Sequence, residues 1–441
     1  MRFILLEEKT VKNNEVKNVG QFQTAVLGLQ HLLAMYSGAV AVPLLIGTAL
    51  KFNSAQMTYL VSIDIFMCGL ATLLQLLRNR YFGIGLPVIL GCAIQAVAPL
   101  KMIGKEFTIG TMYGAIIVAG CFVFLIAGQF SRIKKLFPPV VTGSLITVIG
   151  LTLIPIAVQN LGGGDATAKN FGDPQNLLLG FLTIVVILGV QIWARGFLST
   201  IAVLLGLIVG TIVAAISGMV SAAPITEAAW FHIPQPFYFG MPHFEWSSAV
   251  TMIIIDLVSM VESTGVFFAL GNVLDKKITA ADLKRGYRAE GLAVILGGVF
   301  NTFPYTTFSQ NVGLLQLSGI KTKRPIYWSA GLLMLMGLLP KIGALATIIP
   351  TAVLGGAMLV MFAMISVQGI RMLLRVDFND QRNILIVAIS VGLGLGVSVY
   401  PTIFQFLPKA IQLFLGNGIV VASLASVGLN IIFKGRAGLD E

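Results

Sequence analysis

The sequence has little charge and very few cysteine or histidine residues. Only 11% of its 441 residues are Asp, Glu, Lys or Arg, compared with roughly a quarter of the residues in an average soluble domain. A membrane enzyme would need a metal cluster or a nucleophile paired with a base, and the three histidines show no metal-binding spacing such as His-x-x-x-His. An ordinary soluble domain and a metalloenzyme are therefore both disfavoured, and no cofactor and no bound metal are expected.

The three cysteines, Cys68, Cys92 and Cys121, all lie in apolar segments. A cysteine in such surroundings is most often a small buried side chain, so neither a disulfide nor a metal site is expected. Residues 1–20 are polar and charged, without an apolar h-region followed by a cleavage site, so we expect no signal peptide.

Apolar residues dominate the chain instead. They make up 56% of it, and the mean hydropathy is +0.91. Apolar runs of about 20 residues, the length that crosses a bilayer as a helix, follow one another nearly end to end and predict an all-α membrane protein. The predicted spans are residues 27–48, 57–77, 84–100, 109–129, 140–160, 175–194, 198–218, 249–270, 286–302, 305–318, 325–340, 345–367, 383–400 and 410–433.

The basic residues are distributed unevenly between the two sides of these spans. All but six of the 29 Lys and Arg residues fall in loops on one side of the membrane; the six on the other side are Lys51, Lys101, Lys105, Lys169, Lys341 and Lys409. By the positive-inside rule both termini are cytoplasmic, and fourteen crossings fit best. The net charge of +11 is therefore a topology signal, and no nucleic-acid partner is expected.

This topology divides the chain into five parts. His232 and His243 lie in the loop between Trp230 and Trp246, which we expect to form an extracellular flap. The five parts are a cytoplasmic N-terminal segment (1–26), a first seven-span repeat (27–218), an extracellular loop (219–248), a second seven-span repeat (249–433) and a cytoplasmic tail (434–441).

The tenth span is interrupted by polar residues. Residues 301–313 read Asn-Thr-Phe-Pro-Tyr-Thr-Thr-Phe-Ser-Gln-Asn-Val-Gly between apolar flanks. A bilayer core offers no water, so each unpaired polar group there costs several kcal/mol unless protein or ligand satisfies it. Polar residues beside Pro304 therefore predict a discontinuous helix that lines a cavity, which is the usual construction of a transporter's substrate site.

The third span has the same character. It contains Pro87, Pro99, Gly91 and a lone Gln95, and it lies seven spans before the tenth. An odd number of spans in each half makes the two halves inverted in topology, and paired broken segments in inverted halves point to a binding site at the midplane. Tolerated Gly and Pro in an ordinary membrane helix are the alternative explanation.

Four motifs identify a family. The run from Gln310 to Gly319 resembles the signature of the nucleobase/ascorbate transporter family: Gln, Glu or Pro, then Asn, any residue, Gly, four variable residues, Thr or Ser, and Arg, Lys or Gly. Gln30-His31 is similar to the family's first-span motif, Glu262-Ser263-Thr264-Gly265 to its eighth-span glutamate motif, and 350–356 to its twelfth-span element. The resemblance covers essentially the whole chain.

The resemblance implies a fold and an assembly. The family fold has fourteen spans in two inverted repeats, with short β-strands in spans 3 and 10 ahead of their half-helices. Spans 1–4 and 8–11 form a core domain, and spans 5–7 and 12–14 form a gate domain. A homodimer through the gate domain and an alternating-access, elevator-like mechanism in the bacterial cell membrane are further implications of the resemblance.

The resemblance also implies a purine nucleobase as substrate, and the residues suit one. Glu262 supplies acceptors for two ring N–H groups, and charge-assisted bonds are the stronger kind. The Gln310 amide carries a donor and an acceptor, which match adjacent C=O and N–H groups. Backbone N–H groups at the start of the tenth-span half-helix add donors. The remaining predicted substrate-binding residues are Ser309, Asn311, Ala93, Ile94 and Phe362.

These side chains also have structural alternatives. Glu262 could make a salt bridge or a helix–helix hydrogen bond instead, and Gln310 and Asn311 could cap the helix break. Ile94 occupies a position that often holds an aromatic residue in relatives, so base stacking there is in doubt. Gln310 at the first signature position resembles carriers of xanthine or uric acid, and the eighth-span motif looks most like xanthine permeases of Gram-positive bacteria. Uric acid and uracil remain alternative substrates.

The coupling residue is left open by the sequence. Many relatives carry a titratable residue four positions after the eighth-span glutamate, where this chain has Val266. Glu262, Glu290 and His31 are the candidates to exchange a proton, although His31 is as well explained by an interhelical hydrogen bond. Asp64 and Asp256, also within spans, are interpreted as structural partners.

The chain is therefore predicted to be a proton-coupled purine carrier, with xanthine the first candidate. A channel for nucleobases or anions is the rival of a different class. A broken-helix pair with a carboxylate in a closed pocket favours alternating access over a channel, and saturable, concentrative uptake would separate the two.

Overall fold

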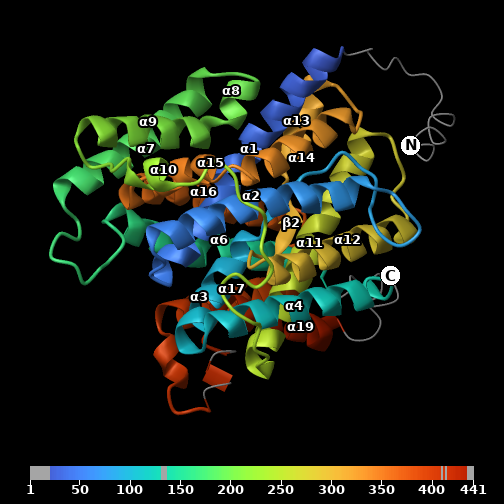
Figure 1. Cartoon of the computed structure of the whole chain (residues 1–441). Coiled ribbons are helices and arrows are strands. Elements are labelled where there is room, and N and C mark those ends of the chain that lie inside the picture. Colours follow the sequence, from blue (N-terminus) through green and yellow to red (C-terminus); the bar gives the residue numbers. More distant parts are fainter. Residues whose placement is uncertain (1–19, 131–136, 409–410, 413–414, 435–441) are drawn as a thin grey trace.

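The computed structural model describes residues 20–130, 137–408, 411–412 and 415–434. Most of the predicted N-terminal segment and nearly all of the predicted tail lie outside these residues. The described part is a helical bundle in which many of the long helices run side by side (Figure 1).

Eight helices of the described part are long and apolar enough to cross a membrane, and a ninth crossing arises if one bent pair is counted as a span. The bent pair is α14 (Arg324–Gly337) and α15 (Pro340–Thr347), at 84° to one another. The eight are α1 (Gln21–Ala49), α2 (Ser54–Leu76), α4 (Ile109–Ile126), α6 (Pro139–Leu161), α7 (Pro174–Trp193), α11 (Trp246–Val273), α16 (Thr351–Leu373) and α17 (Gln381–Val399).

Shorter helices complete the bundle. Helices α9 (Ala202–Ile216) and α19 (Gly418–Lys434) are apolar but shorter. The predicted multi-pass helical architecture is thus present, while the count of fourteen crossings remains a prediction. The other elements are α3 (Val97–Glu106), α12 (Ala280–Val299), α13 (Gln310–Ser318), the short helices α8 (Phe197–Thr200), α10 (Ala223–Glu227), η1 (Ile94–Ala96) and η3 (Pro401–Phe404), and the strands β1 (Leu90–Cys92) and β2 (Tyr305–Thr307).

Local sequence explains where several helices begin. Asn53 and Gln56 form a reciprocal capping box at the start of α2, and Thr279 and Asp282 do so for α12. Helix α7 begins at a proline behind the N-cap Asp173, whose carboxylate accepts the N–H of Gln175. Proline suits the first helical position because its missing N–H would have no partner there.

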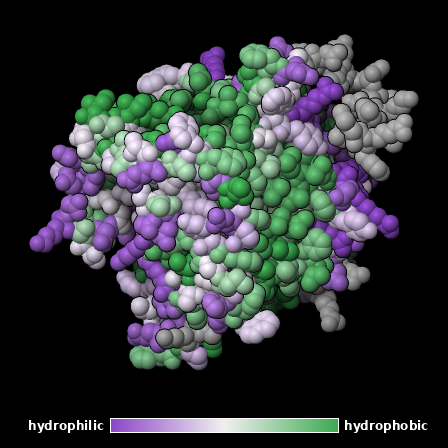
Figure 2. Space-filling model, in the orientation of Figure 1, coloured by the Kyte–Doolittle hydropathy of each residue, from purple (hydrophilic) through white to green (hydrophobic). Residues whose placement is uncertain are grey.

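The helices pack in two groups. One group contains α1, α2, α4, α11, α12, α14 and α15, and the other contains α6, α7, α9, α16, α17 and α19. Only 22% of the apolar window of α7 and 28% of that of α17 is buried, so these two helices turn apolar side chains outward, as a lipid-facing helix must. Figure 2 shows a broad hydrophobic area across one face of the molecule, with hydrophilic residues gathered at its left and right margins.

Two short strands pair in the middle of the bundle, where the two broken segments meet, and we call this place the strand crossing. Strand β1 pairs antiparallel with β2, with Leu90 opposite Thr307 and Cys92 opposite Tyr305; β2 lies near the centre of Figure 1. The N–H of Ala93 donates to the Pro304 carbonyl (2.8 Å), which continues the pairing. The strands predicted ahead of the third and tenth half-helices are therefore present.

Side chains satisfy polar groups that these breaks leave free. The Thr72 hydroxyl accepts the Leu90 N–H (3.0 Å), and the Ser263 hydroxyl lies 3.2 Å from that of Thr306. Such pairing is required of irregular backbone at membrane depth. Hydroxyl groups on α2 and α11 thus help to stabilise the two breaks.

The Phe308 ring packs where the two broken segments meet α1. A Cβ added to Gly38 would lie 2.7 Å from the ring carbon Cε1, and one added to Gly91 would lie 2.9 Å from Cδ2 and closer still to Cε2. Real Cβ atoms essentially never come this close to another heavy atom. Positions 38 and 91 therefore need glycine so that Phe308 can occupy the crossing.

We expect Gly91→Ala to destabilise the protein by about 1–3 kcal/mol, the usual effect of an extra methyl in a packed core, and to reduce transport. Thermal unfolding in detergent and uptake in cells measure the two effects. Gly392→Ala is the matched control, because a Cβ at Gly392 of α17 meets no atom within 4 Å. An unchanged unfolding temperature in Gly91→Ala would show that the crossing is looser than described.

The segment 230–243 lies across the ends of several helices, and we call it the strap. The N–H of His232 donates to Leu338, that of Phe237 to Val299 and that of His243 to Gly110, at 2.8–3.1 Å. A ring nitrogen of His232 lies 2.8 Å from the Gly337 carbonyl. Burial lowers the pKa of His232, although the bond to this carbonyl raises it. The strap holds one end of the first helix group together.

Two predictions about individual segments are wrong. The twelfth span was predicted to begin at residue 345, but α15 occupies the first part of that range and α16 begins at Thr351, after Pro350. Hydropathy is continuous through this region, so an apolar window runs across the break. Cys121, predicted to be buried, is exposed on α4, whereas Cys68 and Cys92 are buried.

Candidate functional site

The candidate site lies beside the strand crossing, on α11. The carboxylate of Glu262 accepts a hydrogen bond from the Gln95 amide (3.2 Å), and the same nitrogen donates to the Ser259 hydroxyl (2.7 Å). Gln95 belongs to η1, which follows β1 directly, so the break in the third segment carries this amide to α11. Glu262 keeps part of its surface exposed and its second oxygen available for a ligand.

The other predicted contacts lie at the starts of the two half-helices. Gln310 begins α13 and is exposed, and Ser309 before it is half-buried. Ala93 is fully buried at the end of the strand pairing, and Ile94 is half-buried at the start of η1. Both half-helices therefore start next to the crossing, where their first N–H groups have no partner within the helix.

Asn311 lies behind the site and binds His31. Its amide nitrogen donates to the His31 carbonyl (2.9 Å) and lies 3.1 Å from His31 Nδ1. Both side chains are almost fully buried. The Asn311 donors are thus used to join α13 to α1, and its Oδ1 is left without a partner among the described residues. This geometry favours the interhelical role of His31.

Two further carboxyls lie between the helices of the first group. Glu290 on α12 is buried and interacts with the Ser263 hydroxyl, which also lies 3.1 Å from the Thr307 hydroxyl of β2. Glu290 is therefore one hydroxyl away from the strand crossing. Asp256 on α11 is buried too, but within the described part of the chain neither of its carboxylate oxygens has a hydrogen-bond partner, which contradicts its interpretation as a structural partner.

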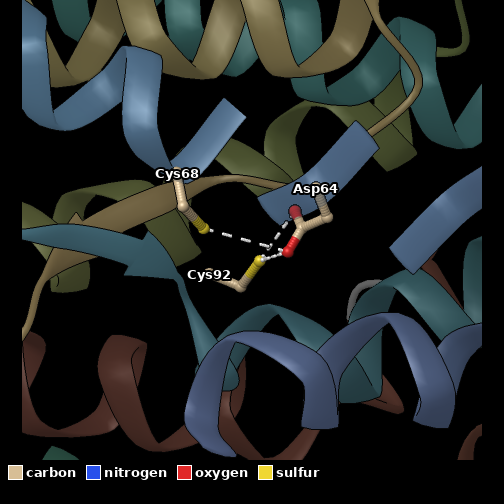
Figure 3. Close-up of side chains that lie close together, drawn as sticks. All are labelled: Asp64, Cys68 and Cys92. Carbon is tan, nitrogen blue, oxygen red and sulfur yellow. Dashed lines mark hydrogen bonds between the residues drawn. The ribbon is translucent and has the colours of Figure 1, made fainter. Parts of the chain in front are cut away.

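Asp64, on α2, forms hydrogen bonds to both strands of the crossing. Its carboxylate accepts hydrogen bonds from the Tyr305 hydroxyl (2.9 Å) and the Cys92 thiol (2.8 and 2.9 Å), and the Cys68 thiol is 3.9 Å away. Figure 3 shows the two thiols directed at the carboxylate. Cys92 and Tyr305 are opposite one another in the strand pair, so one carboxylate holds both strands. The interpretation of Asp64 as a structural partner is confirmed.

The ligand atoms of Asp64, Cys68 and Cys92 all lie within 4.8 Å of one another. Cys68 and Cys92 are buried and free, as expected, and both thiols also contact a buried carboxylate, which the sequence did not predict. Thr302 adds a further polar contact, since its hydroxyl accepts the Tyr305 hydroxyl at 2.8 Å.

Phe362 lies in the second helix group. It is almost fully buried on α16, and its carbonyl oxygen would be 2.7 Å from a Cβ on Gly150 of α6. Its neighbour Met361 approaches Gly38 of α1, next to Phe308. The α6–α16 pair is thus the part of the second group that comes close to the crossing.

The partnership of Gln95 with Glu262 and that of Tyr305 with Asp64 were not predicted from the sequence. A lone Gln in an interrupted apolar segment was a usable signal for the first. The second had no local signal, because Asp64 and Tyr305 are 241 residues apart and only the strand register brings them together.

An apolar helical bundle in which two broken segments cross beside a partly exposed glutamate is the construction of a secondary transporter. A family model described as "Permease family" matches residues 22–403, so the chain belongs to this family. It is a multi-pass membrane transporter and not an enzyme, and the family resemblance of the sequence motifs is confirmed.

Similar proteins of known name cover nearly the whole chain. A "Xanthine permease" of Bacillus subtilis is 53% identical over 93% of this chain and 94% of its own length. A "Uric acid permease PucK" of the same bacterium is 52% identical, over 93% and 96%. A "Nucleobase transporter PlUacP" of Paenibacillus larvae is 51% identical, over 94% and 96%.

Solved structures share the fold at low sequence identity. The transmembrane domain of the cyanobacterial bicarbonate transporter BicA matches with a TM-score of 0.62 over 86% of this chain and 96% of that chain, at 16% identity. The murine anion transporter Slc26a9 in its inward-facing state matches with a TM-score of 0.59 over 96% and 70%, at 13% identity. These similarities support the fold alone.

Proposed function

We propose that the chain carries a purine nucleobase, with xanthine as the first candidate, across the bacterial cell membrane by proton symport. The observation that carries this proposal is Glu262, a partly exposed residue held by Gln95 at the crossing of two broken segments. The names of the similar proteins, which are xanthine and uric acid permeases and a nucleobase transporter, agree with this chemistry.

The site presents a hydrogen-bonding edge that complements a purine. Two adjacent ring N–H groups of the base can donate to the Glu262 carboxylate, and charge-assisted bonds are stronger than neutral ones. The exposed Gln310 amide offers a donor and an acceptor to a neighbouring C=O and N–H pair. The first-turn N–H groups of α13 supply further donors.

Uric acid is the second candidate. The uric acid permease PucK is almost as similar to this chain as the xanthine permease is. The two purines differ by an oxygen on the five-membered ring, whereas Glu262 and Gln310 complement the lactam edges that both share. Selectivity between them therefore rests on residues around the far end of the base.

Proton coupling is proposed through the buried carboxyls beside the site. Because Val266 cannot titrate, the candidates to exchange the proton are Glu262, Glu290 and His31. Glu290 interacts with Ser263, the residue that follows Glu262 on α11, and has one unpartnered oxygen within the described part of the chain. We favour Glu290 over His31, because the bonds of His31 to Asn311 hold it in an interhelical role.

The two helix groups are proposed to be the moving parts. The first group would be the core domain that carries the purine, and the second, with α6 and α16 against the crossing, the gate domain. Fourteen spans in two inverted repeats, cytoplasmic termini and a homodimer through the gate domain belong to the same proposal.

Uptake of radiolabelled xanthine by cells without their own purine carriers tests the proposal. We expect saturable, concentrative uptake that unlabelled xanthine competes and an uncoupler abolishes. Stronger competition by uric acid than by xanthine would make uric acid the substrate. Non-saturable uptake that only follows the gradient would favour a channel, and no uptake of either purine would reject the proposal.

We expect Gln310→Glu to weaken xanthine transport and make it more dependent on pH. The change keeps the size of the side chain but replaces its amide donor with a second carboxylate near Glu262. Two carboxyls in a pocket of low dielectric hold one proton between them at neutral pH, so the donor to the purine C=O is present only when that proton is bound. Transport should therefore recover as the pH falls.

The pH profile of uptake between pH 5 and 8 is the measurement, and the control is Gln381→Glu, which makes the same change at the exposed start of α17, away from the site. A mutant with the wild-type profile would show that Gln310 does not contact the ligand.

A further inference from the structure

A cavity opens where α11 and α13 end, away from Glu262. It has a volume of about 520 Å³, within the range of small-molecule sites. Its walls combine apolar and polar side chains: Ala269, Val273 and Leu315, with Asn272, Gln316 and Lys321. The loops that leave both helices here carry Lys276, Lys277 and Lys323, which places the cavity on the predicted cytoplasmic side.

The cavity and the candidate purine site lie along the same face of α11. On α11, Glu262, Gly265, Ala269 and Asn272 follow one another at helical spacings of three or four residues and so share one face. All four keep exposed surface, and a Cβ on Gly265 would meet no atom within 4 Å. One open face of α11 thus runs from the Glu262 carboxylate to the cavity.

Helix α13 carries a matching row. Ser309, Gly313 and Gln316 follow one another at intervals of four and three residues and so share one face, and each keeps exposed surface. A Cβ on Gly313 would also meet nothing within 4 Å. One row begins at Glu262 and the other at Ser309, beside Gln310. Both end at residues that line the cavity, and α11 contacts α13, so the rows are the two walls of one groove.

The side chains at the cavity end of the groove suit the same purine that is proposed to bind at Glu262. Asn272 and Gln316 are exposed amides, one from each wall. Each amide offers a donor beside an acceptor, the same pair that Gln310 presents. The apolar side chains of Ala269, Val273 and Leu315 offer a surface for the flat face of a base. At the mouth Lys321 pairs with Asp275 at 3.1 Å.

We propose that this cavity is a second, weaker purine subsite, in which the base pauses between the Glu262 site and the cytoplasm. The proposal rests on the proposed function, since it takes the ligand to be an oxopurine. The cavity has no carboxylate aimed at the base and is open to solvent, so its affinity for the purine is lower than that of the Glu262 site.

Cysteine labelling tests the subsite. Gln316→Cys and Asn272→Cys are each made in a Cys121→Ser background, because Cys121 is exposed while Cys68 and Cys92 are buried. Inverted membrane vesicles are treated with a membrane-impermeant maleimide and increasing xanthine. We expect xanthine to slow labelling at both positions several-fold, with half-protection at a concentration above the KM of transport. Lys277→Cys, exposed in the adjoining loop, is the control and should label at a constant rate.

The same labelling in a Glu262→Gln background separates direct protection from an indirect effect. Protection that persists at the same xanthine concentration supports the subsite, because the base then shields the cavity without the main site. Protection that disappears overturns it, since binding at Glu262 would have closed the groove. If xanthine gives no protection in the protein that keeps Glu262, the subsite is also overturned. Failure of the proposed function appears separately, as a wild-type protein that takes up no xanthine.

Discussion

Replacing Glu262 by Gln should lower the affinity for xanthine at least tenfold, and by up to more than a hundredfold. The carboxylate is the one charged acceptor that the candidate site offers to the base. Loss of a hydrogen bond to a charged group costs about 1.5–3 kcal/mol, and each 1.4 kcal/mol is a factor of ten in affinity. The shape is preserved, because the Gln95 amide can still donate to the remaining carbonyl oxygen.

Binding and uptake of radiolabelled xanthine, together with the amount of protein in the membrane, measure this effect. Glu106→Gln is the matched control, because it makes the same chemical change at the exposed end of α3. Unchanged affinity in Glu262→Gln would remove Glu262 from the substrate site and leave it a helix–helix hydrogen bond with Gln95.

Replacing Asp64 by Asn should abolish transport and lower the yield of folded protein. Asp64 accepts hydrogen bonds from Cys92 and Tyr305. The amide oxygen replaces only one of the two carboxylate oxygens. If it takes the place of Oδ1, the new NH2 group stands at Oδ2 and faces the Cys92 and Cys68 thiols that donate there; the reverse placement turns the NH2 group towards the Tyr305 hydroxyl. Each unsatisfied buried group costs roughly 1–3 kcal/mol, and the damage falls on the two strands that position Gln95 and Gln310.

A graded series distinguishes this explanation from a general loss of packing. We expect Tyr305→Phe to be milder than Asp64→Asn, because it removes one donor only, and Cys92→Ser to be mildest, because the hydroxyl still donates. Asp165→Asn, in an exposed turn, is the control. Thermal unfolding in detergent and uptake are the measurements, and equal effects of all three crossing variants would contradict the ordering.

Much of the fold could be predicted because membrane solvation leaves a strong local signal. An uninterrupted apolar run has few conformations open to it in a bilayer other than a helix. The interruptions were equally visible, since Pro304 and the polar residues after it cannot continue such a run. The bend between α14 and α15 was not visible, because Leu338 and Leu339 keep the hydropathy high through it.

The candidate site could be predicted only in part. Glu262 and Gln310 were found from the family motifs and from the cost of a carboxylate in an apolar segment. The role of Gln95 depends on how η1 turns towards α11, and that of Asp64 on the register of two strands far apart in the chain. The partners of His31 and Asn311 likewise follow from the packing of α13 on α1, which no local pattern encodes.

The strap also bears on where a reporter can be inserted. Residues 230–243 bond to the ends of α4, α12 and α14, so an epitope or fluorescent domain placed there would separate helices that must stay in register. The turn at Asp165 to Asn170 is mostly exposed and bonds mainly to itself, and insertions are best tolerated at such tips. Of these two connections, the one between α6 and α7 is the place to attach a label.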